Sequence, residues 1–221
     1  MISPRARQAQ RIARVAAQHN RDMELIMAAV LRRHSNCIDV GCSTGTMLQR
    51  MLRVAPDGQH IAVEPIPDLA GRLRLKFPGV AVHEAALSDR TGTADFDVVI
   101  DELTLSGFQR RTALPGGLRM RTIQVHTVCL DDLVPLSLPV HLIKIDVEGG
   151  ELAALRGAER TLKRCQPHVL LEHGMGPNTE AVYDFLTDCG LALFTVDGRG
   201  PLDRAHFGQV PDAWDYLAKP W

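Results

Sequence analysis

The sequence predicts an α/β fold in which a mostly parallel, seven-stranded sheet with one antiparallel strand carries helices on both faces. The first observation is an alternation of short apolar segments with segments of helical periodicity from residue 36 onward, which is typical of parallel strands joined by helices. The second is size, because 221 residues with 45% hydrophobic content are enough for one ample core. We therefore expect one α/β domain over residues 35–221, preceded by a helical extension over residues 1–34.

Each expected strand is a short run of apolar or β-branched residues, and each expected helix has apolar residues at helical spacing. The strands fall at residues 36–40, 60–64, 80–83, 140–147, 168–172, 191–196 and 214–218. The helices fall at residues 46–54, 69–77, 151–164 and 180–189. We expect the last strand to run antiparallel at or near an edge of the sheet.

The N-terminal extension has helical periodicity over residues 4–33, and the first half of this segment is basic. A basic helix face is usually a solvated surface, although it is also typical of a lid or docking helix that attracts an anionic partner. An apolar stripe over residues 12–31 leaves two further interpretations open, a homodimer contact or packing over the functional site.

Residues 91–130 interrupt the alternation of strands and helices. Two segments rich in β-branched residues, 93–100 and 120–128, are expected strands. Between them, Ser106-Gly107 and Leu114-Pro-Gly-Gly-Leu118 are typical of loops. We interpret the segment as an inserted, hairpin-like element that could cover the functional site.

Composition argues against several classes of function. A net charge of −1 and an aromatic content of 5% do not favour a nucleic-acid partner. No apolar run approaches the roughly 18 residues of a membrane-spanning helix, so we expect no membrane span. The N-terminal segment has no apolar signal-peptide core, and the five cysteines include no CxxC pair. These features are typical of a cytoplasmic protein without a zinc ribbon or a disulfide framework.

The most informative loop follows the first expected strand and spans Asp39 to Gly45. In an open parallel sheet, ligands bind beyond the carboxyl ends of the strands, and the helix after this loop presents free N–H groups there. Gly41 and Gly45 would let the backbone turn tightly and approach a ligand closely. Their GxxxG spacing, with Ser43 between them, differs from the GxGxxG of a dinucleotide loop and from a phosphate-binding P-loop.

Acidic side chains indicate which ligand this loop takes. Glu64 follows Gly45 by 64 − 45 = 19 residues, close to the roughly 20-residue spacing at which a carboxylate binds ribose hydroxyls. Asp39 would repel a pyrophosphate but would attract an amino group or a sulfonium. Ser88 and Asp89 follow the third strand and are candidates for the adenine edge. The pattern predicts a nucleoside that carries an amino-acid tail.

Several segments occur in an order that is found in one enzyme family. They are Ile38-Asp-Val-Gly-Cys-Ser-Thr-Gly45, Val63-Glu-Pro65, Ala85-Ala-Leu-Ser-Asp89, Leu130-Asp-Asp-Leu133 and Leu142-Ile-Lys-Ile-Asp-Val-Glu-Gly-Gly-Glu151. Through them the chain resembles the FkbM-type methyltransferases, which are class I S-adenosylmethionine-dependent enzymes. The resemblance covers roughly residues 36–219, and the last segment is its most specific part.

The resemblance implies a Rossmann-like class I methyltransferase sheet and S-adenosyl-L-methionine as the cofactor. It implies O-methylation of a hydroxyl on a sugar, a polyketide or another secondary metabolite, without indicating which one. It also extends the expected cofactor contacts to Cys42 and Pro65. The chain departs from the family pattern at Cys42-Ser43, where many relatives carry Ala-Asn, and at Gly150, where Ala is commoner. Ser43 and the backbone still suit a cofactor contact.

Three charged residues, Lys144, Asp146 and Glu148, alternate with apolar ones in the strand at 140–147. A period of two places them on one side of the strand. Because buried charges need partners, one interpretation is a structural network around Lys144. The other is that Asp146 and Glu148 face the transferred methyl group, where they would orient the acceptor hydroxyl or contact the amino group of the cofactor.

His173, at the end of the next strand, is the favoured general base, because histidine titrates near neutrality. A structural histidine is the alternative. The expected reaction is a direct in-line displacement, in which the acceptor hydroxyl attacks the sulfonium methyl group. The His, Asp and Glu residues show no tight ligand spacing such as HxxxH, so we expect no metal.

Three other functions remain open at this point. An NAD(P)-dependent oxidoreductase would need a GxGxxG loop, which is missing. A non-catalytic module that binds S-adenosylmethionine would retain the same loop and the same Glu64. A nucleic-acid methyltransferase would need a basic surface, which the insertion could supply through Arg110, Arg111, Arg119 and Arg121. Near-neutral net charge and low aromatic content argue against this last function.

Overall fold

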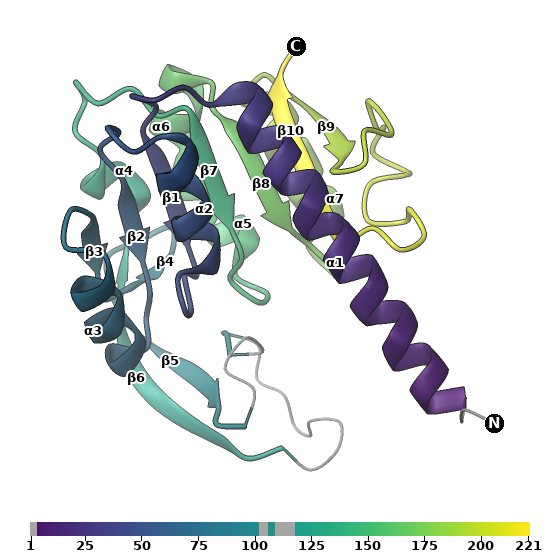
Figure 1. The fold of residues 1–221 in the computed structure, drawn as a ribbon, viewed down its shortest axis with the longest axis horizontal. Coiled ribbons are helices and arrows are strands. Elements are labelled where there is room, and N and C mark those ends of the chain that lie inside the picture. Colours follow the sequence, from purple (N-terminus) through teal and green to yellow (C-terminus); the bar gives the residue numbers. More distant parts are fainter. Residues whose placement is uncertain (1–3, 102–105, 109–117) are drawn as a thin grey trace.

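The computed structural model describes residues 4–101, 106–108 and 118–221. In this part of the chain a seven-stranded sheet has the order β3-β2-β1-β7-β8-β10-β9, and a three-stranded sheet has the order β4-β6-β5 (Figure 1). The strands of the larger sheet are β1 (Cys37–Val40), β2 (Ile61–Val63), β3 (Ala81–His83), β7 (Leu142–Ile145), β8 (His168–Glu172), β9 (Leu191–Thr195) and β10 (Asp215–Pro220).

The larger sheet confirms the predicted fold class. Strand β7 lies at its centre, and the adjacent β1 pairs in parallel with β2 and with β7. Strand β10 is antiparallel to both of its neighbours, β8 and β9, and lies one strand from the edge. Strands β1 and β7 are buried along their whole length, as expected when helices cover both faces of a parallel sheet.

Helices pack on both faces of this sheet through two separate apolar clusters. On one face, Met23 and Met51 from α1 (Pro4–Val30) and α2 (Thr46–Val54) pack against Leu142 and Leu170 of the strands. The other face holds the larger cluster, beneath α5 (Glu151–Arg156), α6 (Glu159–Cys165) and α7 (Thr179–Asp188). Two further helices are α3 (Pro67–Lys76) and the short α4 (Leu130–Leu133).

The single helix that we expected over residues 151–164 is two helices, α5 and α6, so that prediction is wrong at one point. Gly157 lies at the break, and a Cβ there would stand 2.0 Å from the backbone oxygen of Ser88. The Gly157 carbonyl accepts a hydrogen bond from Asp131 N at 2.9 Å. The helix therefore ends where its backbone passes against neighbouring segments.

The insertion contains β5 (Gly92–Val99) and β6 (Met120–Val128), which pair antiparallel from Gly92–Thr127 to Val99–Met120. Strand β4 (Ala86–Leu87) joins β6 in parallel. Figure 1 shows this small sheet extending away from the edge of the main sheet. The expected loop at 114–118 lies mostly outside the described residues, as do Arg110 and Arg111. The division into extension, domain and insertion stays a prediction.

Helix α1 crosses the sheet over β8 and β10 (Figure 1). Its C-terminal half packs tightly, because Met23, Met27 and Leu31 are buried in the cluster with β7 and β8. Part of the apolar stripe is therefore used within the molecule, whereas Ile12 and Leu25 are exposed. A homodimer contact stays a prediction. Among the described helices, none is long and apolar enough to cross a membrane.

Candidate functional site

The loop between β1 and α2 turns through two glycines with positive φ, at 77° for Gly41 and 78° for Gly45. Gly41 N donates a hydrogen bond to Val63 O at 2.9 Å. A Cβ at Gly41 would stand 1.8 Å from the backbone oxygen of Asp146. Only glycine lets this loop pass between β2 and the segment after β7. The loop consequently lies at the carboxyl ends of three adjacent strands.

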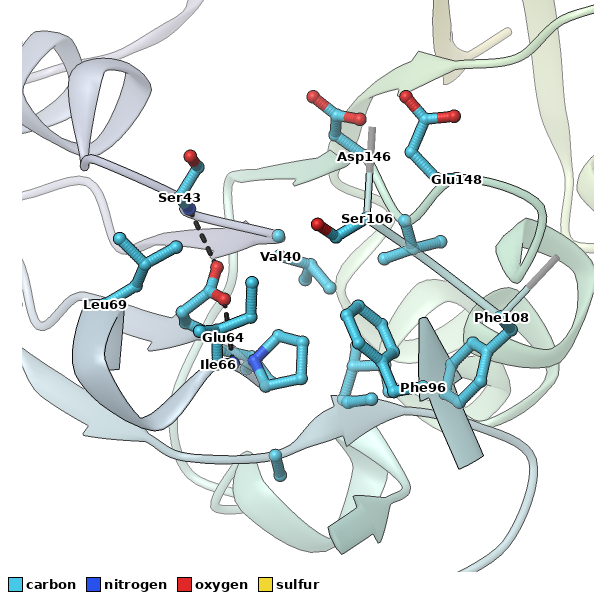
Figure 2. Close-up of a pocket in the computed structure, with 17 residues that line it drawn as sticks. Val40, Ser43, Glu64, Ile66, Leu69, Phe96, Ser106, Phe108, Asp146 and Glu148 are labelled. Atoms are coloured by element: carbon cyan, nitrogen blue, oxygen red, sulfur yellow. Dashed lines mark hydrogen bonds between the residues drawn. The ribbon is translucent and has the colours of Figure 1, made fainter. Parts of the chain in front are cut away.

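Glu64 holds the loop from the neighbouring strand. Its carboxylate accepts hydrogen bonds from Ser43 N at 2.8 Å and from Ile66 N at 2.9 Å (Figure 2). The side chain is buried, and this burial raises the pKa of Glu64 against the opposing effect of the two hydrogen bonds. Each oxygen keeps a lone pair beyond its backbone donor, so the carboxylate is positioned to accept bonds from ribose hydroxyls.

A first cavity, with about 580 Å³ of empty space, opens beside Glu64 and is mostly apolar. Figure 2 shows Ile66, Leu69, Phe96 and Phe108 around it. The two phenylalanine rings meet edge to face, with centroids 5.4 Å apart. Pro65 is part of the wall, and its expected contact with the cofactor stays a prediction. A mostly apolar cavity of this kind suits the adenine ring of a nucleoside.

Ser88 and Asp89 are absent from the walls of this cavity, where Ala85, Ala86 and Leu87 stand instead. The Ser88 backbone is bonded to Val128 O through its N–H at 3.0 Å, which turns the segment toward β6. The expected adenine contact by Ser88 and Asp89 therefore has no support from the geometry, and it stays a prediction.

A second cavity lies on the other side of the loop, with about 1070 Å³ of empty space. Its walls include the loop from Gly41 to Thr44, Asp39 from β1, and Met23 from α1. The side chain of Asp39 is 1% exposed, and its Oδ2 has no hydrogen-bond partner among the described residues. Burial raises the pKa of Asp39 to about 6. Such a carboxylate is prepared for a cationic ligand.

Cys42 lies in the wall of the second cavity, and its thiol donates a hydrogen bond to Asp39 O at 3.0 Å. The side chain is buried, and burial raises the pKa of the Cys42 thiol well above its ordinary value. A protonated thiol is a poor nucleophile. Cys42 therefore packs within the loop and is no candidate nucleophile, and its expected contact with the cofactor stays a prediction.

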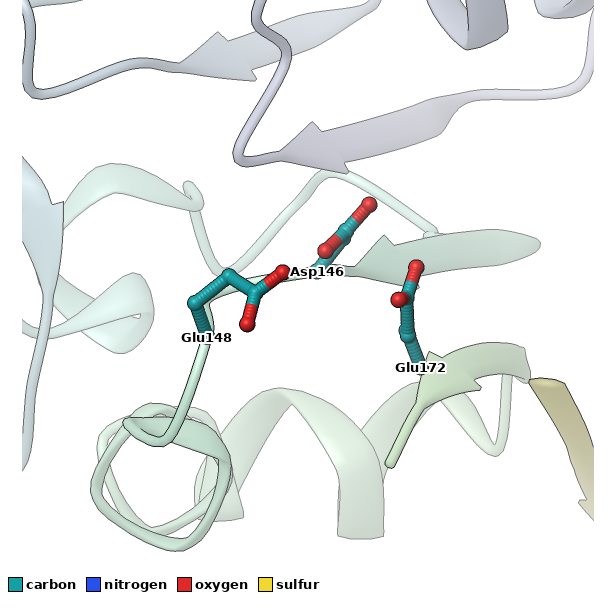
Figure 3. Close-up of side chains that lie close together, drawn as sticks. All are labelled: Asp146, Glu148 and Glu172. Carbon is teal, nitrogen blue, oxygen red and sulfur yellow. The ribbon is translucent and has the colours of Figure 1, made fainter. Parts of the chain in front are cut away.

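Three carboxylates meet where the two sides of the site converge. One oxygen from each of Asp146, Glu148 and Glu172 lies within 4.8 Å of the other two (Figure 3). The strand expected over residues 140–147 is shorter, because β7 ends at Ile145 and Glu148 has a positive φ of 43°. Asp146 and Glu148 therefore follow the end of β7, whereas Glu172 ends β8. Glu172 is not among the site residues expected from the sequence. Its position at the end of a predicted strand was visible in the sequence. Recognising it as a site residue requires knowing that this strand lies beside β7, which the sequence alone does not give.

Lys144 lies buried beneath this carboxylate cluster, with its Nζ 3.6 Å from Asp146 Oδ2 and 3.9 Å from Asp215 Oδ1. Burial lowers the pKa of Lys144, but the combined attraction of the surrounding carboxylates, Asp146 and Asp215 foremost, leaves the pKa above its ordinary value. The charged residues of β7 thus form both the structural network and one wall of the second cavity. The two interpretations made from the sequence are compatible.

Carboxylate oxygens are also the ligands that Mg²⁺ and Ca²⁺ prefer. The cluster of Asp146, Glu148 and Glu172 could supply three such atoms. The ammonium group of Lys144 already lies within 3.6 Å of one of them, and acidic clusters without an ion are common. The absence of a required metal stays a prediction.

His173 lies on the opposite side of its segment from the carboxylate cluster. The ring is 4% exposed and stacks on Phe207 with centroids 5.3 Å apart. Its Nε2 lies 3.0 Å from Thr179 Oγ1, and its Nδ1 lies 3.8 Å from Glu151 Oε2. These contacts are typical of a structural histidine. The general-base assignment of His173 stays a prediction that the geometry does not favour.

Comparison with known proteins now decides the family. A family model for the methyltransferase FkbM domain matches residues 39–192, which is more than half of the chain. The chain belongs to the FkbM methyltransferase family. It is therefore an S-adenosylmethionine-dependent methyltransferase with the Rossmann-like fold of class I. This membership confirms the cofactor that the loop and Glu64 predicted, and it removes the oxidoreductase alternative. No curated protein matches the sequence of this FkbM-family chain.

Solved structures show the same fold. A methyltransferase FkbM from Methylobacillus flagellatus matches with a TM-score of 0.54 and 17% identity, over 85% of this chain and 44% of its own length. This chain thus spans less than half of that protein. An rRNA methylase from Streptococcus thermophilus matches with a TM-score of 0.50 and 12% identity, over 90% of this chain and 95% of its own.

Proposed function

We propose that this FkbM-family methyltransferase transfers the methyl group of S-adenosylmethionine to a hydroxyl of a small molecule, such as a sugar, a polyketide or another secondary metabolite. One observation carries the proposal: the nucleoside side of the loop and the acidic second cavity adjoin at Asp146 and Glu148, which line both cavities. The cofactor and an acceptor can therefore lie on either side of one line of carboxylates.

The residues that are present fit the cofactor. In our proposal, the apolar slot between Leu69 and Phe96 takes the adenine, and Glu64 accepts hydrogen bonds from the ribose hydroxyls. The unpaired oxygen of Asp39 takes the ammonium of the amino-acid tail, because a buried carboxylate without a partner gains most from a cationic ligand. Gly41 and Ser43 contact the cofactor through their backbone at the turn.

The chemistry that S-adenosylmethionine supplies is an activated methyl group on a sulfonium. The protein's part is to hold the acceptor oxygen in line with this methyl group and to exclude water from it. In this proposal, Asp146 and Glu148 accept hydrogen bonds from the acceptor and orient its hydroxyl, which is the second of the two roles expected for them.

The charge of the second cavity favours a small-molecule acceptor over a nucleic acid. Among the described residues of its wall, five carboxylates outnumber the two cations, Lys144 and Arg50; the carboxylates are those of Asp39, Asp146, Glu148, Glu172 and Asp215. A phosphate backbone would be repelled there. The five free cysteines also favour our proposal of a cytoplasmic location, where thiols stay reduced.

Isothermal titration with S-adenosylmethionine tests the cofactor site. Glu64→Gln should lower the affinity by roughly tenfold or more. The NH₂ group of glutamine cannot accept a hydrogen bond from one of the two backbone N–H groups, and the negative charge is lost. Glu84→Gln is the matched control, since Glu84 is exposed and pairs with Arg74 at the surface. Equal affinity in both variants would contradict the ribose assignment.

Transfer of a labelled methyl group to a panel of hydroxylated metabolites tests the acceptor. Label should appear in an ether product whose formation depends on an intact Glu64. Binding of the cofactor without transfer to any compound, or transfer to RNA in place of the metabolites, would contradict the proposed acceptor class.

A further inference from the structure

Glu172 lies where two cavities of the site meet. It lines the second cavity together with the cofactor loop, and it also lines a third cavity beside residues 173–178. Asp146, Glu148 and Trp214 are the other residues that both cavities share. A group at this position can contact a molecule in the second cavity and can exchange protons with solvent through the third.

The direction of the Glu172 side chain follows from the sheet. Leu170 packs beneath α1 in the cluster on that face, and residues two apart in a strand point to the same side. Glu172 therefore faces the second cavity, whereas His173 points away from it and stacks on Phe207. Of Glu172, which ends β8, and His173, which follows it, only Glu172 belongs to the carboxylate cluster.

The charges around Glu172 keep its carboxyl group ready to exchange a proton. Burial raises its pKa to about 8, with a further rise from Asp146 and a smaller one from Asp215 and Glu148, against the lowering by Lys144. His19 of α1 faces Asp215 from the other side, with Nδ1 3.0 Å from Oδ2. No described residue forms a hydrogen bond with the Glu172 carboxylate, so it is free to accept one.

A second observation indicates that a ligand belongs in this cavity. Asp39 lies in the same wall, is 1% exposed, and keeps its Oδ2 without a partner among the described residues. Burying an unpaired carboxylate oxygen is costly unless a cation completes it. A cationic ligand in the cavity that Asp39 and Glu172 both line would complete this carboxylate.

We propose that Glu172 is the general base that takes the proton of the acceptor hydroxyl, an inference that rests on the proposed function. The acceptor oxygen bonds to the methyl carbon while the methyl–sulfur bond breaks and its electron pair stays on sulfur. The hydroxyl proton passes to a Glu172 carboxylate oxygen. It then leaves to solvent through the third cavity, which restores the carboxylate.

Binding of the cofactor prepares this base. The sulfonium and ammonium groups of S-adenosylmethionine bring positive charge into the cavity, and a nearby positive charge favours the ionised carboxylate. Glu172 should therefore lose a proton when the cofactor binds at a pH slightly below 8. The ionised form of Glu172, which can accept a proton, is therefore populated mainly in the complex with the cofactor.

Titration with S-adenosylmethionine at pH 7.5, in two buffers of different ionisation enthalpy, measures this proton without any acceptor. The wild-type protein should release a fraction of a proton, and Glu172→Gln should release clearly less with its affinity for the cofactor nearly unchanged. Glu180→Gln is the matched control, since Glu180 is exposed on α7 and should behave like the wild type.

Turnover on concentrated glycerol, read as methylated glycerol by mass spectrometry, tests the step itself. Glu172→Gln should lower the rate by roughly 100-fold or more, and Glu172→Asp should recover part of it. Equal proton release in Glu172→Gln and wild type, or equal turnover, would overturn the proposal. Turnover that a chelator abolishes and Mg²⁺ restores would also overturn the proposal, because the carboxylate cluster would then hold a metal. If the wild-type protein does not bind S-adenosylmethionine, the proposed function itself is refuted.

Discussion

Asp39 combines burial, charge and the lack of a partner, so removing its charge has opposite effects on stability and on binding. Asp39→Asn keeps the size of the side chain. In the folded protein the pKa of Asp39 is about 6, against an ordinary value of 3.8. The ionised form therefore costs the fold about 3 kcal/mol, at 1.36 kcal/mol for each pH unit between the two values.

The sign of this effect follows from linkage. Because the folded pKa is raised, the cost is absent below pH 3.8 and grows until the pH passes the folded value of about 6. Asp39→Asn should consequently be more stable than the wild type by about 3 kcal/mol at pH 8 and by about half of this at pH 5. It should also bind S-adenosylmethionine roughly 10- to 100-fold more weakly, because one charged hydrogen bond is lost.

Urea unfolding with linear extrapolation, at pH 5 and pH 8, measures the stability difference. Asp188→Asn is the matched control, since Asp188 is exposed and its removal should change little at either pH. A variant Asp39→Asn that is less stable than the wild type at pH 8, or whose stability difference does not depend on pH, would refute the reasoning. If Asp39→Asn stabilises the fold and weakens cofactor binding, Asp39 is present for ligand binding at a cost in stability.

Three further predictions concern the loop, the histidine and the N-terminal helix. Gly41→Ala should lower both the melting temperature and cofactor affinity, because its Cβ would stand 1.8 Å from the backbone oxygen of Asp146; an unchanged titration would argue against the close approach. His173→Ala should lose about 2–3 kcal/mol of stability in urea unfolding while the folded enzyme keeps its turnover, and the opposite pattern would return the base role to His173. The pKa of His19 is raised, chiefly by its hydrogen bond with Asp215, so its contribution is complete below pH 6.5 and is lost as pH rises through the folded pKa; His19→Gln should therefore be less stable than wild type at pH 6 and nearly equal at pH 9, and a difference that grows with pH would contradict the pairing.

The features that could be predicted from the sequence are those set by neighbours along the chain. The turn with Gly41 and Gly45 requires positive φ, which leaves a visible pattern of glycines. Asp146 and Glu148 reach the site because they directly follow β7, at the carboxyl end of the sheet where ligands bind. Local periodicity and turn chemistry were enough for these elements.

The features that could not be predicted depend on which strands become neighbours. Glu172 joins the carboxylate cluster only because β8 lies beside β7 in the sheet. The break at Gly157 arises from its approach to Ser88, which is distant in the sequence. The orientation of His173 away from the site follows from its packing on Phe207. Tertiary packing decides each of these, and no local pattern records it.

A crystal structure of the protein with S-adenosylhomocysteine tests the central claim most directly. The account predicts the adenine between Leu69 and Phe96, the ribose hydroxyls on Glu64 and the ammonium on Asp39. The sulfur should then point toward the cluster that contains Glu172. A nucleoside bound in another cavity, or a ligand whose ribose and ammonium contact neither carboxylate, would contradict it.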